Sequence, residues 1–272
     1  MPLKIPALLA AILVCAATIA HADPVLDRAK TRGSLVAAAV PDQLPLAARD
    51  ASGTLTGFDI AVAQELGKRL DLPVTFVTPG WDAILSGDEG GQWDFAVASI
   101  TPTPRRAEKL SFPALYRLDA TVAVVRADEK KIQRPRDASG KTIGVMANTT
   151  FQRYLNHSLS LEDGTVSVPY LIEDPKVETF PSNNDALQAL VQGKVEAVVT
   201  TLSVAAAARK GGQAIRILPG FLYFEPVAVA TAKGDPQFDA AVAEAIVDMR
   251  ADGTLSRLST EWFGIDLGTI FP

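Results

Sequence analysis

Short apolar runs and longer periodic segments alternate along this chain, and the order predicts strands followed by helices. Residues 58–70 place apolar side chains at helical spacing, and Pro73 prevents the helix from continuing. Residues 34–40, 74–77 and 95–99 are short apolar runs typical of buried strands. The first part of the chain therefore predicts strands joined by a helix.

The same order of elements returns in the second half of the chain. In the first half, a short helix is also expected at residues 81–85, and the proline-rich residues 100–106 are expected to form a loop. Alternating strands and helices imply mostly parallel sheets covered by helices. The later predictions are strands at 142–145, 177–180 and 198–200, and helices at 149–155, 186–192 and from 204 onward.

Two such runs predict an α/β protein with two lobes. The strand-like segments 118–125 and 223–232 lie between the runs, and Asp235 with Pro236 marks the start of a final helix. Two extended crossings would let each lobe move as a rigid body about a two-strand hinge. The expected boundaries are 23–118 with 226–272 for lobe 1, 119–225 for lobe 2, and about 118–121 and 222–226 for the hinge.

The first 22 residues have the pattern of an export signal. Lys4 precedes an apolar run over residues 5–20, which is short for a membrane span, and a small-x-small sequence ends at Ala22. We therefore expect cleavage after Ala22 and a periplasmic mature chain. Cleavage would remove Cys15, the single cysteine, and would leave His157 as the single histidine.

This inventory disfavours several classes of function. Without cysteine and with one histidine, disulfides, thiolate or multi-histidine metal sites and Ser-His-Asp catalysis are not expected, and neither is a cofactor. We expect His157 to be a solvated loop residue. The net charge of −5 argues against a nucleic-acid partner, which would favour a basic surface.

Several stretches share a family resemblance in their order and spacing. They are 55–60 (LTGFDI), 81–84 (WDAI), 93–106 (WDFAVASITPTPRR), 140–145 (GKTIGV), 148–150 (NTT), 185–187 (DAL), 193–197 (GKVEA), 249–254 (MRADGT) and 262–264 (WFG). Together they resemble the polar-amino-acid group (family 3) of bacterial periplasmic solute-binding proteins. The resemblance implies the type II two-lobed fold and a monomer without enzymatic activity. It further implies a small carboxylate ligand, such as an amino acid, and a membrane permease of an ABC importer as partner.

The resemblance places a ligand site at the carboxyl end of the third strand. A ligand carboxylate that loses its water on closure needs a cation and hydrogen-bond donors in exchange. Arg106 suits this role because a guanidinium makes a planar two-point contact. Ser99 and Thr101 lie where α/β sheets usually receive ligands. Thr149 and Thr150, at a helix start in the second lobe, can add hydroxyl and backbone N–H donors.

Two of these positions have an alternative interpretation. Arg106 could instead be a surface arginine paired with Glu108 or Asp82. Trp81 occupies a family position that flanks the ligand, but it could equally be a core residue at the start of its helix.

The chain departs from the family pattern at two positions. Where family members commonly have an aspartate that receives the ligand α-ammonium, this chain has Thr201. Either the ligand lacks that ammonium, or another carboxylate supplies the charge, with Glu225 the stronger candidate and Asp42 the weaker. Gln43 replaces an aromatic side chain that often covers the ligand, and it would either hydrogen-bond the ligand or face solvent.

Two other functions are compatible with the same fold. One is a periplasmic dehydratase of the cyclohexadienyl kind, which would need an acid with a raised pKa facing the substrate, a role open to Glu225. The other is a ligand-sensing partner of a membrane receptor. Transport is the favoured prediction.

Overall fold

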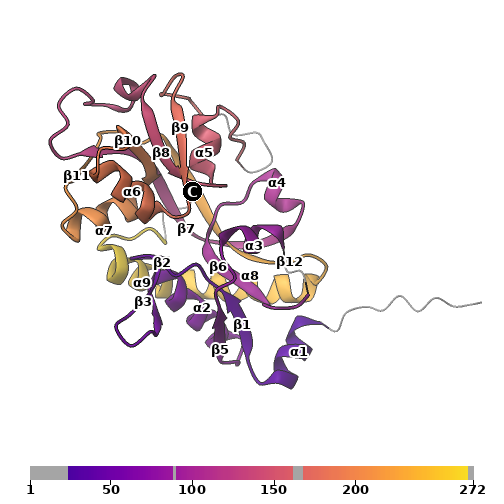
Figure 1. Ribbon diagram of the computed structural model, residues 1–272. Coiled ribbons are helices and arrows are strands. Elements are labelled where there is room, and N and C mark those ends of the chain that lie inside the picture. Colours follow the sequence, from indigo (N-terminus) through magenta and orange to yellow (C-terminus); the bar gives the residue numbers. More distant parts are fainter. Residues whose placement is uncertain (1–23, 88–89, 162–167, 269–272) are drawn as a thin grey trace, which may run out of the picture.

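A single twisted sheet runs through both halves of the molecule (Figure 1). The computed structural model describes residues 24–87, 90–161 and 168–268, and within them nine strands form this sheet in the order β5-β1-β6-β12-β7-β10-β8-β9, with β11 paired to β7. Its strands are β1 (Leu35–Ala38), β5 (Val74–Val77), β6 (Phe95–Ile100), β7 (Leu110–Arg126), β8 (Thr142–Met146), β9 (Lys176–Phe180), β10 (Ala197–Thr201), β11 (Ile215–Ile217) and β12 (Tyr223–Ala232). A small second sheet contains β2 (Asp42–Gln43), β3 (Ala47–Arg49) and β4 (Leu55–Thr56).

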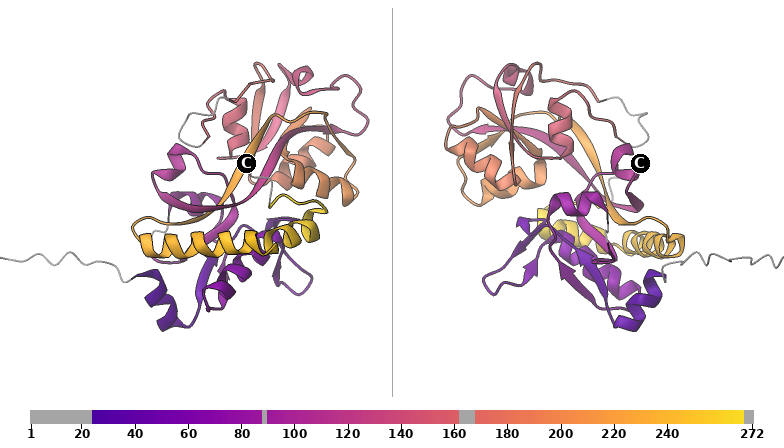
Figure 2. Two further views of the ribbon diagram at one scale, coloured as in Figure 1. Left: turned by 180° about the vertical axis from the view of Figure 1, so that it is seen from behind. Right: turned by 45° about the vertical axis from the view of Figure 1, so that its right-hand side comes forward.

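Helices cover the sheet in both halves (Figure 2). They are α1 (Val25–Arg32), α2 (Phe58–Arg69), α3 (Trp81–Ser86), α4 (Pro104–Ala107), the 3₁₀ helix η1 (Pro135–Ala138), α5 (Thr150–Leu155), α6 (Asn183–Val191), α7 (Leu202–Lys210), α8 (Pro236–Ala251) and α9 (Thr254–Phe263). The predicted two-lobed α/β fold is confirmed.

Parallel pairing holds each lobe together, and antiparallel pairing joins the two. In one lobe β1 pairs in parallel with β5 and β6, and in the other β8 pairs in parallel with β9 and β10. Between them β7 and β12 run antiparallel, from Tyr223 opposite Thr121 to Ala232 opposite Leu110. The predicted strand at 118–125 therefore begins much earlier, because residues 110–117 find hydrogen-bond partners in β12.

Each lobe has its own apolar core. In the first, α2 and α8 bury Phe58 and Phe238 against the sheet residue Phe95. In the second, Tyr154 and Leu155 of α5 pack on the other end of the sheet. The helical spacing read from residues 58–70 corresponds to this buried face. Polar side chains can gather at the boundary between these two cores.

Local capping explains where the elements differ from the prediction. Residues 104–107 form a short helix and not a loop, because the Thr103 side chain caps it and Pro104 suits the first turn. Helix α6 begins at Asn183, three residues earlier than predicted, because Ser182 caps it. Thr149 and Asp235 cap α5 and α8 as predicted.

Several of the other predictions concern the chain ends and His157. The predicted signal segment, residues 1–22, lies outside the described residues. Within residues 24–268 as described, none of the helices is both long and apolar enough to cross a membrane. His157 is exposed as expected, and its ring stacks on Tyr170 with 4.4 Å between ring centroids.

Candidate functional site

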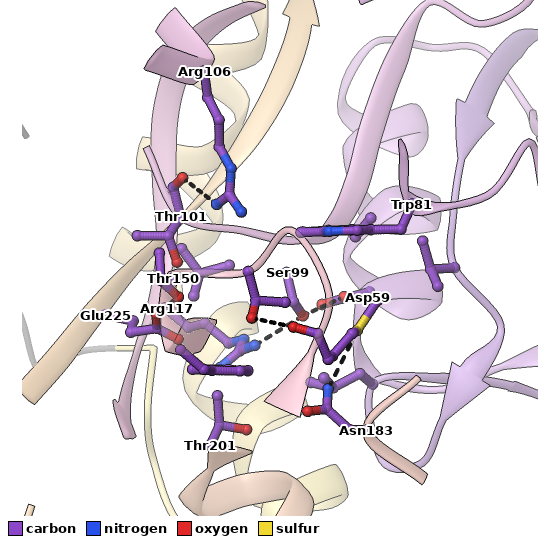
Figure 3. A pocket seen from close by; sticks show the side chains of 17 residues that line it. Asp59, Trp81, Ser99, Thr101, Arg106, Arg117, Thr150, Asn183, Thr201 and Glu225 are labelled. Atoms are coloured by element: carbon purple, nitrogen blue, oxygen red, sulfur yellow. Dashed lines mark hydrogen bonds between the residues drawn. The ribbon is translucent and has the colours of Figure 1, made fainter. Parts of the chain in front are cut away.

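A cavity of about 60 Å³ lies between the lobes (Figure 3). Its walls come from the start of α3, the carboxyl end of β6, α4, the start of α5, the end of β10 and the strands β7 and β12. Eight of the nine predicted site residues line it: Trp81, Ser99, Thr101, Arg106, Thr149, Thr150, Thr201 and Glu225. Gln43 and Asp42 form β2, but their side chains lie outside the described part of the structure.

Arg106 reaches into this cavity from α4 and is 8 % exposed. Its Nη1 donates to the Thr101 carbonyl oxygen at 2.8 Å, and its guanidinium carbon lies 5.2 Å from the ring centroid of Trp81. Burial lowers the pKa of Arg106 to about 10, so the group stays charged at neutral pH. Asp82, the alternative partner, accepts a hydrogen bond from Asn148 instead. The guanidinium is thus held in place while part of it faces the cavity.

Glu225 supplies a buried carboxyl group to the same cavity. The Thr150 hydroxyl donates to its Oε1, and the side chain is almost fully enclosed. Burial raises the pKa of Glu225 to about 7, although the positive charges of Arg106 and Arg117 act in the opposite direction. Arg106 and Glu225 therefore bring a cation and a readily protonated acid into the same enclosed space.

A second charged cluster in the wall was not anticipated from the sequence. Asp59 accepts hydrogen bonds from Ser99 Oγ at 2.6 Å and from Tyr116 Oη at 2.9 Å, and burial raises its pKa. Arg117 donates to Ser99 Oγ at 2.8 Å and to Asp119 Oδ2 at 2.6 Å. A sequence signal existed, because charged residues inside otherwise apolar strand and helix segments are buried only when paired.

Ser99 lies at the centre of this cluster with an unusual backbone. Its φ is 54°, in the left-handed region that non-glycine residues rarely adopt, and its N–H donates to Tyr116 Oη at 3.1 Å. Such conformations persist only where the surroundings hold them, and they gather at functional sites. The strained turn supports a functional role for the end of β6.

Thr201, at the end of β10, caps α7 by accepting from the Val204 N–H. Its Oγ1 is 3.0 Å from Ser203 Oγ, which in turn donates to Asp119 Oδ2 at 2.5 Å. Asn183 is a further polar lining residue that the sequence did not single out, and it accepts from the Thr200 hydroxyl at 3.0 Å. No local pattern marks Asn183, because it faces the cavity only through the packing of α6.

Asn148 connects the two lobes across the edge of the cavity. Its carbonyl oxygen accepts from Arg106 Nη2 at 3.2 Å and from Trp81 Nε1 at 3.4 Å, and its Nδ2 donates to Asp82 Oδ1 at 2.8 Å. All three partners belong to the opposite lobe, and Asn148 itself has a φ of 59°. The structure is therefore closed over the cavity.

Comparisons with known proteins find a matching family and several named relatives. The family model described as bacterial extracellular solute-binding proteins, family 3, matches residues 35–265. The L-cystine-binding protein TcyJ of Escherichia coli is 27% identical over 244 residues, covering 89% of this chain and 87% of TcyJ. The histidine-binding periplasmic protein of Salmonella typhimurium is 29% identical over 232 residues, covering 84% and 86%.

Solved structures are similar over most of this chain. A mutant of ArgBP from T. maritima superposes with a TM-score of 0.76 at 25% identity, covering 88% of this chain and 99% of that one. The ancestral amino acid-binding protein AncCDT-1, a precursor of cyclohexadienyl dehydratase, gives 0.75 at 29% identity with the same coverage.

Proposed function

Because the chain belongs to the bacterial extracellular solute-binding proteins, family 3, we propose that it is the periplasmic binding component of an ABC importer for an amino acid or an amino-acid-like carboxylate. The relatives are named as binding proteins for L-cystine, histidine and other amino acids. A small ligand and a membrane permease as partner follow from that membership.

The observation that supports the ligand class is the pairing of opposite charges in one closed cavity. Arg106 offers a guanidinium for a carboxylate, with Thr101, Ser99 and the N-terminal end of α5 beside it. Glu225 offers a carboxylate for an ammonium group. A zwitterion satisfies both charges, whereas a simple carboxylic acid satisfies one of them.

Transport would use closure of the lobes as its signal. We assign 23–118 with 226–272 to lobe 1 and 119–225 to lobe 2, with the hinge at about 118–121 and 222–226. The antiparallel pairing of β7 and β12 across this region supports the assignment. The ligand would bind to lobe 1 first, and Thr149, Thr150 and the Asn148 contacts would join on closure. The mature protein would begin after Ala22 and act as a monomer.

A thermal-shift screen of the purified protein tests this function. The screen uses the standard amino acids, L-cystine and their decarboxylated amines, because a ligand that binds only the folded state raises Tm. We expect at least one amino acid to raise Tm and its amine to leave Tm unchanged. An Arg106→Ala variant should lose the shift, and a shift by the amines would contradict the proposed role of Arg106.

One observation favours a second candidate, a dehydratase acting on a carboxylate substrate. The pKa of Glu225 is raised to about 7, which suits a general acid, and the structural neighbour AncCDT-1 is a precursor of cyclohexadienyl dehydratase. Incubation with prephenate and with arogenate, followed by chromatography of the products, separates the two candidates. We expect the wild-type protein to form no product. Product formation by the wild type that is absent in Glu225→Gln would establish the dehydratase instead.

A further inference from the structure

Of the five hydroxyl side chains that line the cavity, the four other than Thr101 share a property that limits what the ligand can be. Each of the four donates its proton to a protein acceptor, so that what it has left for a ligand is lone pairs. Ser99 donates to Asp59 at 2.6 Å, Thr149 to the Met146 carbonyl oxygen at 2.7 Å and Thr150 to Glu225. The fourth hydroxyl, Thr201 Oγ1, lies 3.0 Å from Ser203 Oγ, and the neighbours of Ser203 make Thr201 the donor of that pair.

The direction of the Thr201 hydrogen bond follows from its neighbours. Asp119 Oδ2 accepts from Arg117 Nη1 at 2.6 Å and from Ser203 Oγ at 2.5 Å, and Oδ1 accepts from the Ala120 N–H at 2.8 Å. A carboxylate that faces three donors has no proton to give. The Ser203 hydroxyl therefore donates its proton to Asp119. In its contact with Thr201, Ser203 must then accept, and Thr201 must donate.

We propose that Ser203 and Asp119 fix Thr201 as a hydrogen-bond acceptor for the α-ammonium of the ligand. With its proton directed to Ser203 and one lone pair taken by the Val204 N–H, Thr201, which lines the cavity, has one lone pair left for the ligand. The charge of Asp119 polarises the two hydroxyls in series, which strengthens the acceptor. Thr201 is thus the residue that selects the ligand, and Ser203 and Asp119 are positioning residues.

This inference rests on the proposed function and decides between its two ligand classes. A hydroxyl that can only accept favours an N–H donor. It disfavours a keto acid, whose oxygen would face a lone pair without a hydrogen between them. A hydroxy acid can donate one hydrogen bond, but it brings no positive charge for Glu225. The ligand therefore keeps its ammonium group.

Calorimetric titration with matched ligand pairs tests the relay of hydroxyl groups. The pairs are glycine with glycolate, L-alanine with L-lactate, L-aspartate with L-malate, L-phenylalanine with L-phenyllactate, and L-histidine with imidazolelactate. The wild-type protein should prefer the amino acid in every pair that binds. Ser203→Ala should reduce that preference by roughly tenfold or more, since a hydrogen bond to a charged group has about this effect.

The reason for the change in Ser203→Ala is that the Thr201 hydroxyl becomes free to rotate and to donate. The amino acid should then bind more weakly and the hydroxy acid more tightly, which a general loss of stability would not produce. Thr201→Ser should keep the preference, and Thr201→Val should lose it. Ser259→Ala is the matched control, because Ser259 is a buried serine that makes two hydrogen bonds outside the relay and does not line the cavity.

The outcomes separate the relay from the function on which it rests. Failure of both members of every pair to bind would refute the proposed function and the relay together. Binding of amino acids with an unchanged preference in Ser203→Ala, or a wild-type preference for the hydroxy acids, would refute the relay alone.

Discussion

Glu225 is expected to make ligand affinity rise with pH. Burial raises the pKa of its carboxyl group to about 7, so the group is protonated at lower pH in the empty cavity. A bound ammonium requires the ionised form. At about pH 5, two pKa units below that value, ionising the group costs about 3 kcal/mol, since each unit corresponds to about 1.4 kcal/mol. The affinity at about pH 5 should therefore be about 100-fold weaker than above pH 7.

Calorimetry across this pH range, in two buffers of different ionisation enthalpy, measures both the affinity and the protons released. Below the pKa, binding should release one proton for each ligand bound. Glu225→Gln should flatten the dependence. Asp59→Asn is the matched comparison, because Asp59 is the other buried cavity acid whose pKa burial raises. Of the groups around Glu225, Arg106 stays charged throughout, since its pKa is about 10.

The same group should affect the stability of the empty protein with the opposite trend. A carboxyl group whose folded pKa is raised holds its proton more tightly in the native state. The stabilisation that this group gives to the folded protein is fully present below its pKa in the unfolded chain. It is lost as pH rises through the folded pKa of about 7. Between those limits the free energy of unfolding should fall by about 3 kcal/mol. An affinity independent of pH, or an unchanged slope in Glu225→Gln, would refute the reasoning.

Three further predictions concern single contacts. Arg106→Ala should weaken amino-acid binding by about 2–5 kcal/mol in titration calorimetry, because it removes a desolvated charge, while the exposed neighbour variant Arg105→Ala should bind normally. Asp82→Ala removes an inter-lobe hydrogen bond and should raise the rate of ligand dissociation roughly 2- to 10-fold in stopped-flow experiments. Equal rates in the variant and the wild type would contradict a role of this hydrogen bond in holding the lobes closed. Gly57→Ala should lower the free energy of unfolding by about 1–3 kcal/mol in urea, since φ is 130° and a Cβ would lie 2.3 Å from a backbone oxygen. Gly53→Ala, with a φ of 84° and nothing within 4 Å, should cost less and serves as its control.

The sequence by itself determined the lobes, most element positions and the residues at the strand ends. Periodic apolar positions fix which segments are helices or strands, because this signal depends on residues a few positions apart. The carboxyl ends of parallel strands meet at one edge of a sheet, so the sequence alone places Ser99 and Thr101 at that edge. The motif context then identified Arg106, which lies in the cavity as expected.

Only the tertiary structure decided which charges meet in the cavity and which groups surround each hydroxyl. Thr201 and Asp119 are far apart in sequence, and Ser203 joins them only because α7 packs against β7. The raised pKa of Glu225 likewise comes from burial by both lobes, which no local pattern reports. Desolvation and hydrogen-bond direction depend on every neighbour in space, whereas periodicity depends on neighbours in the chain.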